Sequence, residues 1–225
     1  MITKRKITDY IGIVANTAQT SHYELSFDGL SEGLRRFLGS KNVDRAFVLR
    51  NAGLLCSSAS LPGSQLATTE TRGNFMGVIE PMVHSRIYTT INLDFYVDKQ
   101  YKMLKFIEHW MDYISNGSEN SGVTKDQDGY YYRMRYPKDA GNGYKCDKIK
   151  LIKFDRDYKD SIEYTFYEMF PRNFSSVPVQ YGSSDTLKMS VEFAYTRYIC
   201  GKSSSLSRQF GNNENFTSSL LGLLT

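Results

Sequence analysis

Hydrophobic and polar positions alternate most clearly between residues 153 and 200. The last segment, residues 186–198, is predicted to be one long strand. Its apolar face consists of Leu187, Met189, Val191, Phe193 and Tyr195, and its polar face of Lys188, Ser190, Glu192 and Thr196. Ile162, Tyr164 and Phe166 alternate in the same way earlier in this stretch. Strict alternation is typical of a strand with one buried face. Prolines and a Gly/Ser/Asp run between the two segments exclude a helix there and predict turns, so the stretch is predicted to form antiparallel sheet.

A second strong pattern covers residues 86–115. Residues 86–97 alternate and predict another strand, and residues 98–115 carry apolar side chains at helical spacing. Asp98 is the expected N-cap of this helix, whose apolar stripe consists of Met103, Leu104, Phe106, Ile107, Trp110, Met111 and Ile114. So broad a stripe has to pack on a sheet, and we expect Trp110, Ile107 and Met103 to anchor the helix in the core.

The remaining segments give shorter signals. Residues 22–27 and both ends of 46–60 have strand character, with Gly53 as a bend. Ser31 and Gly39 are the expected caps of a short helix. Residues 130–136 and 144–154 are predicted to be paired strands, whereas residues 64–81 show no helix period and only weak alternation and predict a long loop.

These elements predict a mainly β (α+β) fold, an antiparallel two-sheet β-sandwich or barrel with one flanking α-helix. We expect an N-terminal arm at residues 1–20, one β-sandwich domain at 21–200 that contains the helix at 98–115, and a flexible tail at 201–225. The tail is rich in Ser and Asn and has an apolar end.

Composition favours an associating β protein. Hydrophobic residues make up 40% of the chain and aromatic residues 14%, with 17 tyrosines and 13 phenylalanines. Tyrosine and phenylalanine favour strands, and tyrosine is common where a side chain is buried at one end and wet at the other. No apolar run reaches the roughly 20 residues that a membrane helix needs, and the basic N-terminus is not followed by the apolar stretch of about 7–15 residues that a signal peptide needs. We therefore expect no membrane anchoring and a protein made in a cytoplasm.

The sequence offers no pattern for catalysis or for a cofactor. The three cysteines (Cys56, Cys146 and Cys200) and the three histidines (His22, His84 and His109) are all isolated. No pair has the spacing of a zinc site or of a disulfide framework. The acidic residues near 126–128 and 155–160 lack the twelve-residue calcium pattern. We predict neither enzymatic activity nor a cofactor or metal site.

Residues 130–136, YYYRMRY, are the strongest signal for another class of function. Tyrosine rings can stack on bases while arginines hold phosphates, as on RNA-binding sheets. The same alternation also suits an ordinary strand with tyrosines toward a core or interface and arginines toward solvent. A nucleic-acid-binding β-sheet module is therefore the alternative from this class. The net charge of +4 neither requires nor excludes such a partner.

The order of elements resembles the tail tube proteins of T-even-like contractile-tailed bacteriophages. The resemblance covers roughly residues 45–198, and four segments carry it: ASLPG at 59–63, FYVD at 95–98, FPRN at 170–173, and SDTLKMSVEFAY at 184–195. It is greatest to the longer tube proteins of T-even-like phages of marine and cyanobacterial hosts. Residues 21–45 and those after 200 depart from the family pattern.

The resemblance implies a structural virion protein whose hexameric rings stack into the inner tail tube. One sheet of each subunit would join its neighbours around a lumen that conducts phage DNA, and the tube would be driven through the host envelope when the sheath contracts. The implied partners are further copies of the chain, the tail sheath, the baseplate and tape-measure proteins, and double-stranded DNA in passage without sequence-specific binding. The implied location is the virion tail, after assembly in the host cytoplasm.

The resemblance also suggests which residues assemble the tube. The loop after Leu61-Pro62-Gly63 would reach the adjacent ring, through Gln65, Thr69, Arg72, Asn74, Phe75 and Met76. The strand face toward the lumen or a neighbouring subunit would hold Lys188, Ser190, Glu192, Asp94 and Asn92, with Glu163 and Arg86 as further lumen candidates. The sign of the lumen charge is left open. A baseplate or tail-end protein of the same fold, an initiator or terminator, is the alternative within this class.

Overall fold

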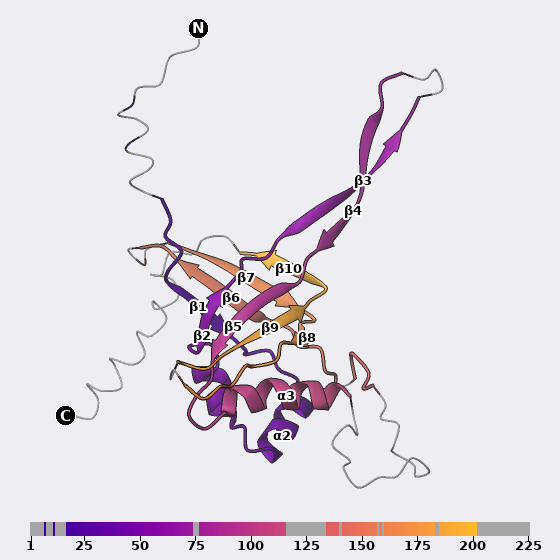
Figure 1. Ribbon diagram of the computed structural model, residues 1–225. Coiled ribbons are helices and arrows are strands. Elements are labelled where there is room, and N and C mark those ends of the chain that lie inside the picture. Colours follow the sequence, from indigo (N-terminus) through magenta and orange to yellow (C-terminus); the bar gives the residue numbers. More distant parts are fainter. Residues whose placement is uncertain are drawn as a thin grey trace, which may run out of the picture. The chain divides into compact units, whose positions relative to one another are not determined.

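The computed structural model describes residues 7, 11, 17–73, 77–115, 134–139, 141–156, 158, 160–182 and 185–201. The chain divides into two compact units. One consists of residues 1–24, 151–163 and 200–225, and the other of residues 25–150 and 164–199. The second unit contains the complete sheet, the helices and the hairpin described below (Figure 1).

Four strands form a sheet that lies entirely in the second unit. They are β2 (Cys56–Ala59), β5 (Ile91–Tyr96), β9 (Lys188–Ala194) and β8 (Phe170–Phe174), in the order β2-β5-β9-β8. β5 and β9 run antiparallel with Leu93 opposite Val191 and Phe95 opposite Met189. The apolar positions of both strands are buried, as the alternation predicts. The segment 170–174, which lies where the prolines predict turns, is in fact an edge strand paired to β9.

A second four-stranded sheet contains β1 (Tyr23–Ser26), β6 (Ile149–Phe154), β7 (Ser161–Tyr167) and β10 (Arg197–Cys200), in the order β1-β6-β7-β10. Each of these strands has residues in both units. Two antiparallel four-stranded sheets confirm the predicted mainly β fold class. The single long strand predicted at 186–198 is divided, because the chain turns at Thr196, whose backbone N–H donates to the carbonyl oxygen of Tyr167.

Helix α3 (Lys102–Ile114) supplies the centre of the aromatic core. Trp110 is fully buried, with its ring 5.6 Å from Phe106 and 6.0 Å from Phe193 on β9. Phe27 joins the cluster with its ring 5.4 Å from Phe106 and 6.4 Å from Phe95 on β5. Met103 and Ile107 are also fully buried, so all three expected anchor residues lie in the core.

The helix starts later than the sequence predicts. Its N-cap position is Tyr101, in the left-handed region with φ of 57°, rather than Asp98. The Asp98 carboxylate nevertheless accepts a hydrogen bond from the backbone N–H of Met103 at 2.9 Å. Asp98 therefore satisfies one of the free N–H groups of the first turn from outside the helix, which is the role of a capping side chain.

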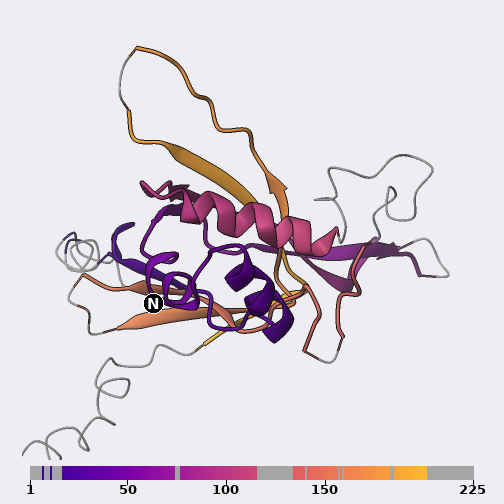
Figure 2. The same ribbon diagram turned by 90° about the horizontal axis from the view of Figure 1, so that it is seen from below.

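Helix α2 (Glu32–Ser40) packs beside α3, with the Phe37 ring 5.4 Å from the Tyr113 ring (Figure 2). Ser31 caps it as predicted, because its hydroxyl accepts from the N–H of Leu34. The C-cap is Lys41 rather than Gly39, which lies inside the helix. Among the described residues, the sheets are accompanied by the helix predicted at 98–115 and by this shorter one, whose caps the sequence also indicates.

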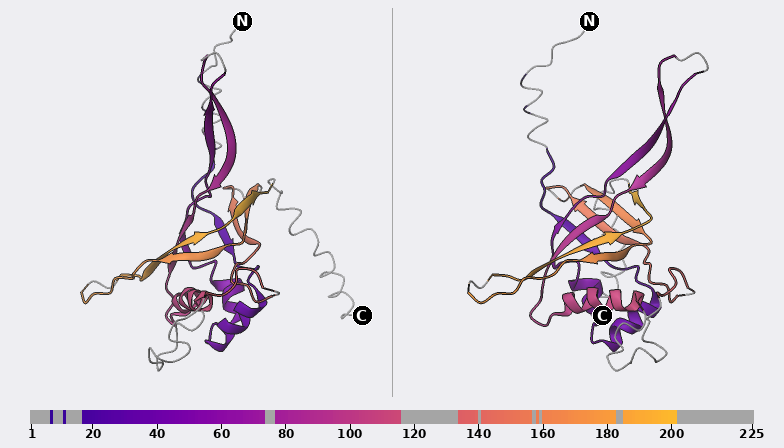
Figure 3. Two further views of the ribbon diagram at one scale, coloured as in Figure 1. Left: turned by 90° about the vertical axis from the view of Figure 1, so that its right-hand side faces the viewer. Right: turned by 45° about the vertical axis from the view of Figure 1, so that its right-hand side comes forward.

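The segment predicted as a long unpatterned loop is a β-hairpin. Strands β3 (Ser64–Thr71) and β4 (Glu80–Tyr88) pair from Ser64 opposite Tyr88 to Thr71 opposite Glu80. The strand predicted at 86–97 is thus two strands, β4 and β5, which separate at Thr89 and Thr90 and join different sheets. Figures 1 and 3 show the hairpin projecting from the β2-β5-β9-β8 sheet. Both its faces are exposed, and the hairpin therefore lacks the alternation that marks a half-buried strand.

Residues 47–51 are helical, and only the end of the 46–60 segment is a strand. The π-helical turn η1 (Phe47–Asn51) buries Phe47 and Val48, and β2 follows from Cys56. Gly53 forms the bend between them, as predicted. A Cβ at Gly53 would lie 1.7 Å from the carbonyl oxygen of Leu25, so this close backbone approach requires glycine.

The predicted pairing of 130–136 with 144–154 is wrong in the part that the structure describes. Residues 134–136 are not in a strand, and β6 begins only at Ile149 and pairs with β1 and β7. Residues 130–133 lie outside the described residues. The Arg135 side chain instead packs over the Tyr113 ring, 4.0 Å from its centroid, and Nε donates to the Tyr113 carbonyl oxygen at 3.0 Å. Arg135 is therefore engaged within its own subunit.

Candidate assembly surfaces

The polar side of the β2-β5-β9-β8 sheet holds the side chains that we expect to face the lumen or a neighbouring subunit. Cross-strand pairs place Asn92 opposite Glu192, Asp94 opposite Ser190, and Tyr96 opposite Lys188. Directly opposite residues point to the same face of a sheet. We call this surface the open face, and it comprises Asn92, Asp94, Tyr96, Arg172, Lys188, Ser190 and Glu192.

Charges on the open face are mixed. Arg172 on β8 lies 3.6 Å from the Glu192 carboxylate, and the Lys188 ammonium lies over the Tyr96 ring, 5.2 Å from its centroid. Asp94 is the other acid of the face, half-buried between β2 and β9. Two acids and two bases leave no strong local field of either sign. Sequence patterning does not reveal Arg172, because it predicts turns rather than a strand at 170–173. It does not reveal Tyr96, because the register that pairs Tyr96 with Lys188 appears only in the structure.

Glu163 and Arg86 do not belong to the open face. Glu163 lies on β7 in the other sheet, and Arg86 lies on β4 in the hairpin. Alternation gives the side of a strand but not the sheet that the strand joins, so it could not show that these two lumen candidates lie apart from Glu192 and Lys188.

The hairpin exposes an unusual amount of apolar surface. Among its residues, Leu66, Val78, Met82, Val83 and Ile87 are each at least 50% exposed. The expected contact residues Gln65 and Thr69 lie on β3 and Arg72 follows it, all exposed. Asn74, Phe75 and Met76 lie outside the described residues. Exposed apolar side chains concentrated on one projecting element indicate a binding surface for another protein chain.

A cluster around Arg86 fixes the base of the hairpin. Arg86 Nη2 donates to the Ser64 hydroxyl at 2.9 Å, and its guanidinium stacks over the rings of Tyr88 and Tyr198. The two tyrosine rings meet edge to face at 5.4 Å. Cation–π contacts together with hydrogen bonds hold both hairpin strands against β10, so the hairpin has a defined direction at its root.

A second charged network joins three turns of the second unit. Glu168, at the turn between β7 and β8, accepts hydrogen bonds from Lys145 at 3.2 Å and from Thr196 at 2.7 Å, and pairs with Lys138. The hydrogen bonds from Lys138 and Thr196, followed by that from Lys145, lower the pKa of the Glu168 carboxyl to about 2. Since these groups come from the 137–145 segment, the β7–β8 turn and the β9–β10 turn, Glu168 ties the three together.

This network predicts an acid-sensitive contribution to stability. A carboxyl whose pKa is depressed in the folded state stabilises the protein above its unfolded pKa, and that contribution is lost as the pH falls toward the folded pKa. For Glu168 the window runs from about pH 4.5 down to about pH 2. We expect the Tm to fall across this range, and to fall less steeply in Glu168→Gln. Scanning calorimetry at several pH values measures this. Equal slopes in both proteins would contradict the assignment.

The described part of the chain shows no group of His, Cys, Asp and Glu side chains that could hold a metal ion. Cys146 is buried, and burial raises the pKa of its thiol to about 12, as in a structural cysteine. No helix among the described residues is long and apolar enough to cross a membrane.

One exposed segment was not singled out by the sequence. Residues 175–182 and 185–187 connect β8 to β9 and extend away from the sheet (Figure 2). Val179 and Tyr181 are almost fully exposed on it. Its proline and glycine, Pro178 and Gly182, predict turns, but nothing in their pattern predicts that the segment leaves the body of the protein.

Three features together indicate a protein that assembles with other protein chains. They are a sheet with a solvated mixed-charge face, an apolar hairpin fixed at its base, and a second projecting segment. Solved structures share this fold. A chain of the "Extracellular Contractile Injection System, PVC sheath-tube complex in extended state" is similar with a TM-score of 0.50 and 14% identity, over 87% of this chain and 97% of that one. A chain of the "PVC sheath/tube terminator in extended state" also has a TM-score of 0.50 and 14% identity, over 82% and 96%. At these identities the likeness shows the fold alone.

The family is shown by the sequence. The profile described as "Phage tail tube protein" matches residues 18–201, and the chain therefore belongs to the phage tail tube protein family. No curated protein matches the chain. As a member of this family it is a non-enzymatic structural protein of the phage tail, and it is located in the virion tail.

Proposed function

We propose that the protein forms the inner tube of a contractile tail of the T-even type, as hexameric rings that stack along the tail. The family match over residues 18–201 supports a tube protein. The four segments that resemble T-even-like tube proteins support the finer assignment. The division into an arm at 1–20, a tube domain at 21–200 and a tail at 201–225 stays part of this proposal.

The proposal rests on the hairpin, because the apolar side chains that it exposes are unfavourable in a free subunit. At least 50% of each of five large apolar side chains on it is exposed, and no described element packs over them. Burying apolar surface contributes about 25 cal/mol per Å², so a partner that covers these side chains is strongly favoured. We assign that partner to a second copy of the chain in the adjacent ring.

The open face is the proposed lining of the tube or the contact with a neighbour in the ring. β2 and β8 are the edge strands of this sheet, and exposed edges favour pairing with another strand. Closure of six sheets into one barrel would satisfy both edges and turn the open face toward the lumen. Its mixed charges, with Arg172 and Lys188 already engaged by Glu192 and Tyr96, suit the passage of DNA without tight phosphate contacts.

Partners beyond the chain itself follow from this role. We propose that the sheath surrounds the tube, that baseplate and tape-measure proteins meet its end and lumen, and that double-stranded DNA passes without sequence-specific binding. A structure similar to this chain is described as part of a sheath-tube complex, which supports the sheath. Assembly would take place in the host cytoplasm before the tail joins the virion.

Negative-stain electron microscopy of the purified protein over a range of concentrations tests the proposal. We expect rings at low concentration and stacked tubes at high concentration. Uniform monomers at every concentration would contradict it.

A tube-end protein of the same fold is the second candidate. The likeness to a sheath/tube terminator, with the same TM-score of 0.50, favours it specifically. The same micrographs separate the two functions, because a terminator forms rings that never stack on one another.

A further inference from the structure

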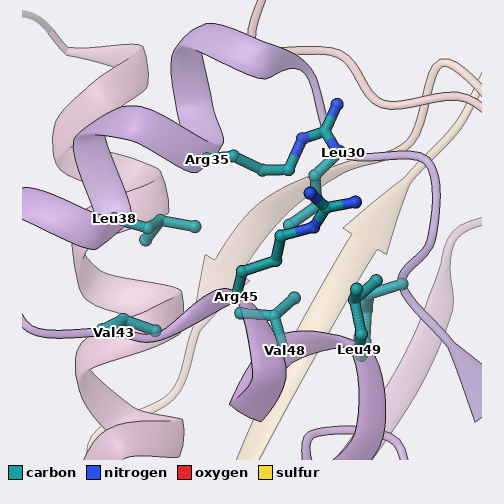
Figure 4. A pocket seen from close by; sticks show the side chains of 8 residues that line it. Leu30, Arg35, Leu38, Val43, Arg45, Val48 and Leu49 are labelled. Carbon is teal, nitrogen blue, oxygen red and sulfur yellow. The ribbon is translucent and has the colours of Figure 1, made fainter.

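A small apolar pocket with two arginines lies between helix α2 and the η1 segment (Figure 4). Its walls are Phe27, Leu30, Leu38, Val43, Val48 and Leu49, and its volume is about 10 Å³, so a larger group binds at its open mouth rather than inside it. Arg35 enters from α2, and Arg45 lies just before η1. Figure 4 shows both guanidinium groups directed toward the same mouth of this pocket.

Neither arginine has an acidic partner among the described residues. The two nearest acids in the sequence are already paired, since Glu32 pairs with Arg36 and Asp44 lies 3.2 Å from Lys102. Arg35 Nε is buried and makes no hydrogen bond. A buried donor without a partner costs free energy, and two like charges at one mouth repel each other. Arg45 is exposed, so an anion that sits between the two guanidinium groups at the mouth would relieve their repulsion.

A planar carboxylate suits this arrangement. Guanidinium groups bind carboxylates through two parallel hydrogen bonds, and such pairs are strong when apolar walls exclude water. Leu49, 36% exposed at the rim, offers apolar contact beside the charge. The pocket is therefore suited to an acidic side chain that has apolar neighbours in its own sequence.

The distal end of the hairpin has this composition. Glu80 is exposed and pairs with Thr71 near the end of β3, and Val78 and Ile79 directly before it are 94% and 41% exposed. The Glu80 carboxylate forms no ion pair with any described residue. Figures 1 and 3 place the hairpin and the α2–η1 region at opposite ends of the second unit, so one subunit cannot bring Glu80 to its own Arg35 and Arg45.

We infer that Glu80 of one subunit binds between Arg35 and Arg45 of a second copy of this chain in the next ring. Two different surfaces at opposite ends of one unit make a head-to-tail contact, which extends without closing and so builds a filament. The inference rests on the proposed tube function and deepens it, because it names the receptor of the hairpin. An acidic segment of the sheath is the competing occupant.

A charge exchange tests the inference. We expect Arg45→Glu and Glu80→Arg each to raise the protein concentration needed for stacked tubes by about tenfold or more, since like charges then face each other. The rings themselves should persist. Combining Arg45→Glu with Glu80→Arg in one chain should bring that concentration back to near the wild-type value.

Two matched controls carry the same charge changes outside the contact. Arg50→Glu alters an exposed arginine of η1 that does not line the pocket, and Glu70→Arg alters the hairpin acid opposite Pro81, which points to the other face from Glu80. Both controls should stack like the wild type. Thermal melts verify folding, and Arg45→Gln, which only removes charge, should give a smaller defect in the same direction.

The outcomes separate this inference from the proposed function. Wild-type protein that never stacks would contradict the tube function and the inference together. Wild-type tubes with normal stacking of Arg45→Glu, or a double variant no better than either single one, would overturn the inference alone. Normal stacking of Arg45→Glu with loss of co-sedimenting sheath protein would assign the pocket to the sheath and likewise overturn it.

Discussion

Replacing Trp110 by alanine is expected to lower the free energy of unfolding by about 3–5 kcal/mol. Trp110 is fully buried, contacts Phe106 and Phe193, and donates its indole N–H to the Tyr144 carbonyl oxygen at 3.2 Å. The substitution leaves a large cavity between α3 and the sheet and an unpaired carbonyl. Urea unfolding followed by circular dichroism measures the change, because Trp110 is the only tryptophan and its fluorescence is lost with it.

Two further variants bracket this result. Trp110→Phe keeps an aromatic ring in the core but loses the hydrogen bond to Tyr144, so its cost should be clearly smaller. Glu108→Ala on the exposed side of the same helix should change stability by about 0.5 kcal/mol or less. A Trp110→Ala protein as stable as Glu108→Ala would show that the core is not organised around α3.

Shortening the hairpin is expected to abolish tubes and spare rings. The variant deletes residues 67–85 and joins Leu66 to Arg86 through an Asn-Gly turn, which suits a two-residue hairpin. It keeps the base cluster of Arg86, Ser64, Tyr88 and Tyr198, and it removes Val78, Met82 and Val83 with most of the exposed apolar surface. Sedimentation velocity and negative-stain microscopy should then show single rings at concentrations at which the wild type stacks.

The removed part of the hairpin provides its own control. None of its described residues is buried, so the Tm should stay within a few degrees of the wild-type value. An unfolded variant would show that the hairpin contributes to the fold of the subunit. Normal tubes from the shortened protein would contradict an inter-ring role of the hairpin.

The elements that the sequence predicts correctly are those whose burial has a period. β9 alternates because one face meets the core while the other stays polar, and the stripe of α3 reflects one packed side. The register of β5 against β9 then places Asn92, Asp94, Lys188, Ser190 and Glu192 on one face, although they come from segments almost a hundred positions apart. The grouping of these residues was predicted, whereas their role in a lumen remains a proposal.

The hairpin escaped prediction for a physical reason. Its two faces are equally exposed in the subunit, and a strand without a buried face has no alternation to detect. β4 also continues almost directly into β5, so Ile87 and Ile91 share one alternating pattern although Ile87 is 50% exposed and Ile91 is buried. Sequence periodicity cannot show that a chain leaves one sheet for another within two residues.

The arginine pocket and the Glu168 network could not be predicted from the sequence. Arg35 and Arg45 are separated by a helix end and a turn, and Glu168 contacts Lys138, Lys145 and Thr196, which lie far from Glu168 in the sequence. Tertiary folding alone brings these groups together, and each would be taken for an ordinary surface charge in the sequence.

The central claim is that the chain builds a tube through its open face and its hairpin. A cryo-electron microscopy reconstruction of the wild-type assembly tests it most directly. We expect stacked hexameric rings in which Asn92, Asp94, Lys188, Ser190 and Glu192 line the lumen or the contact within a ring, while each hairpin contacts the next ring. Rings with the open face on the outside, or stacked without any hairpin contact, would contradict the account.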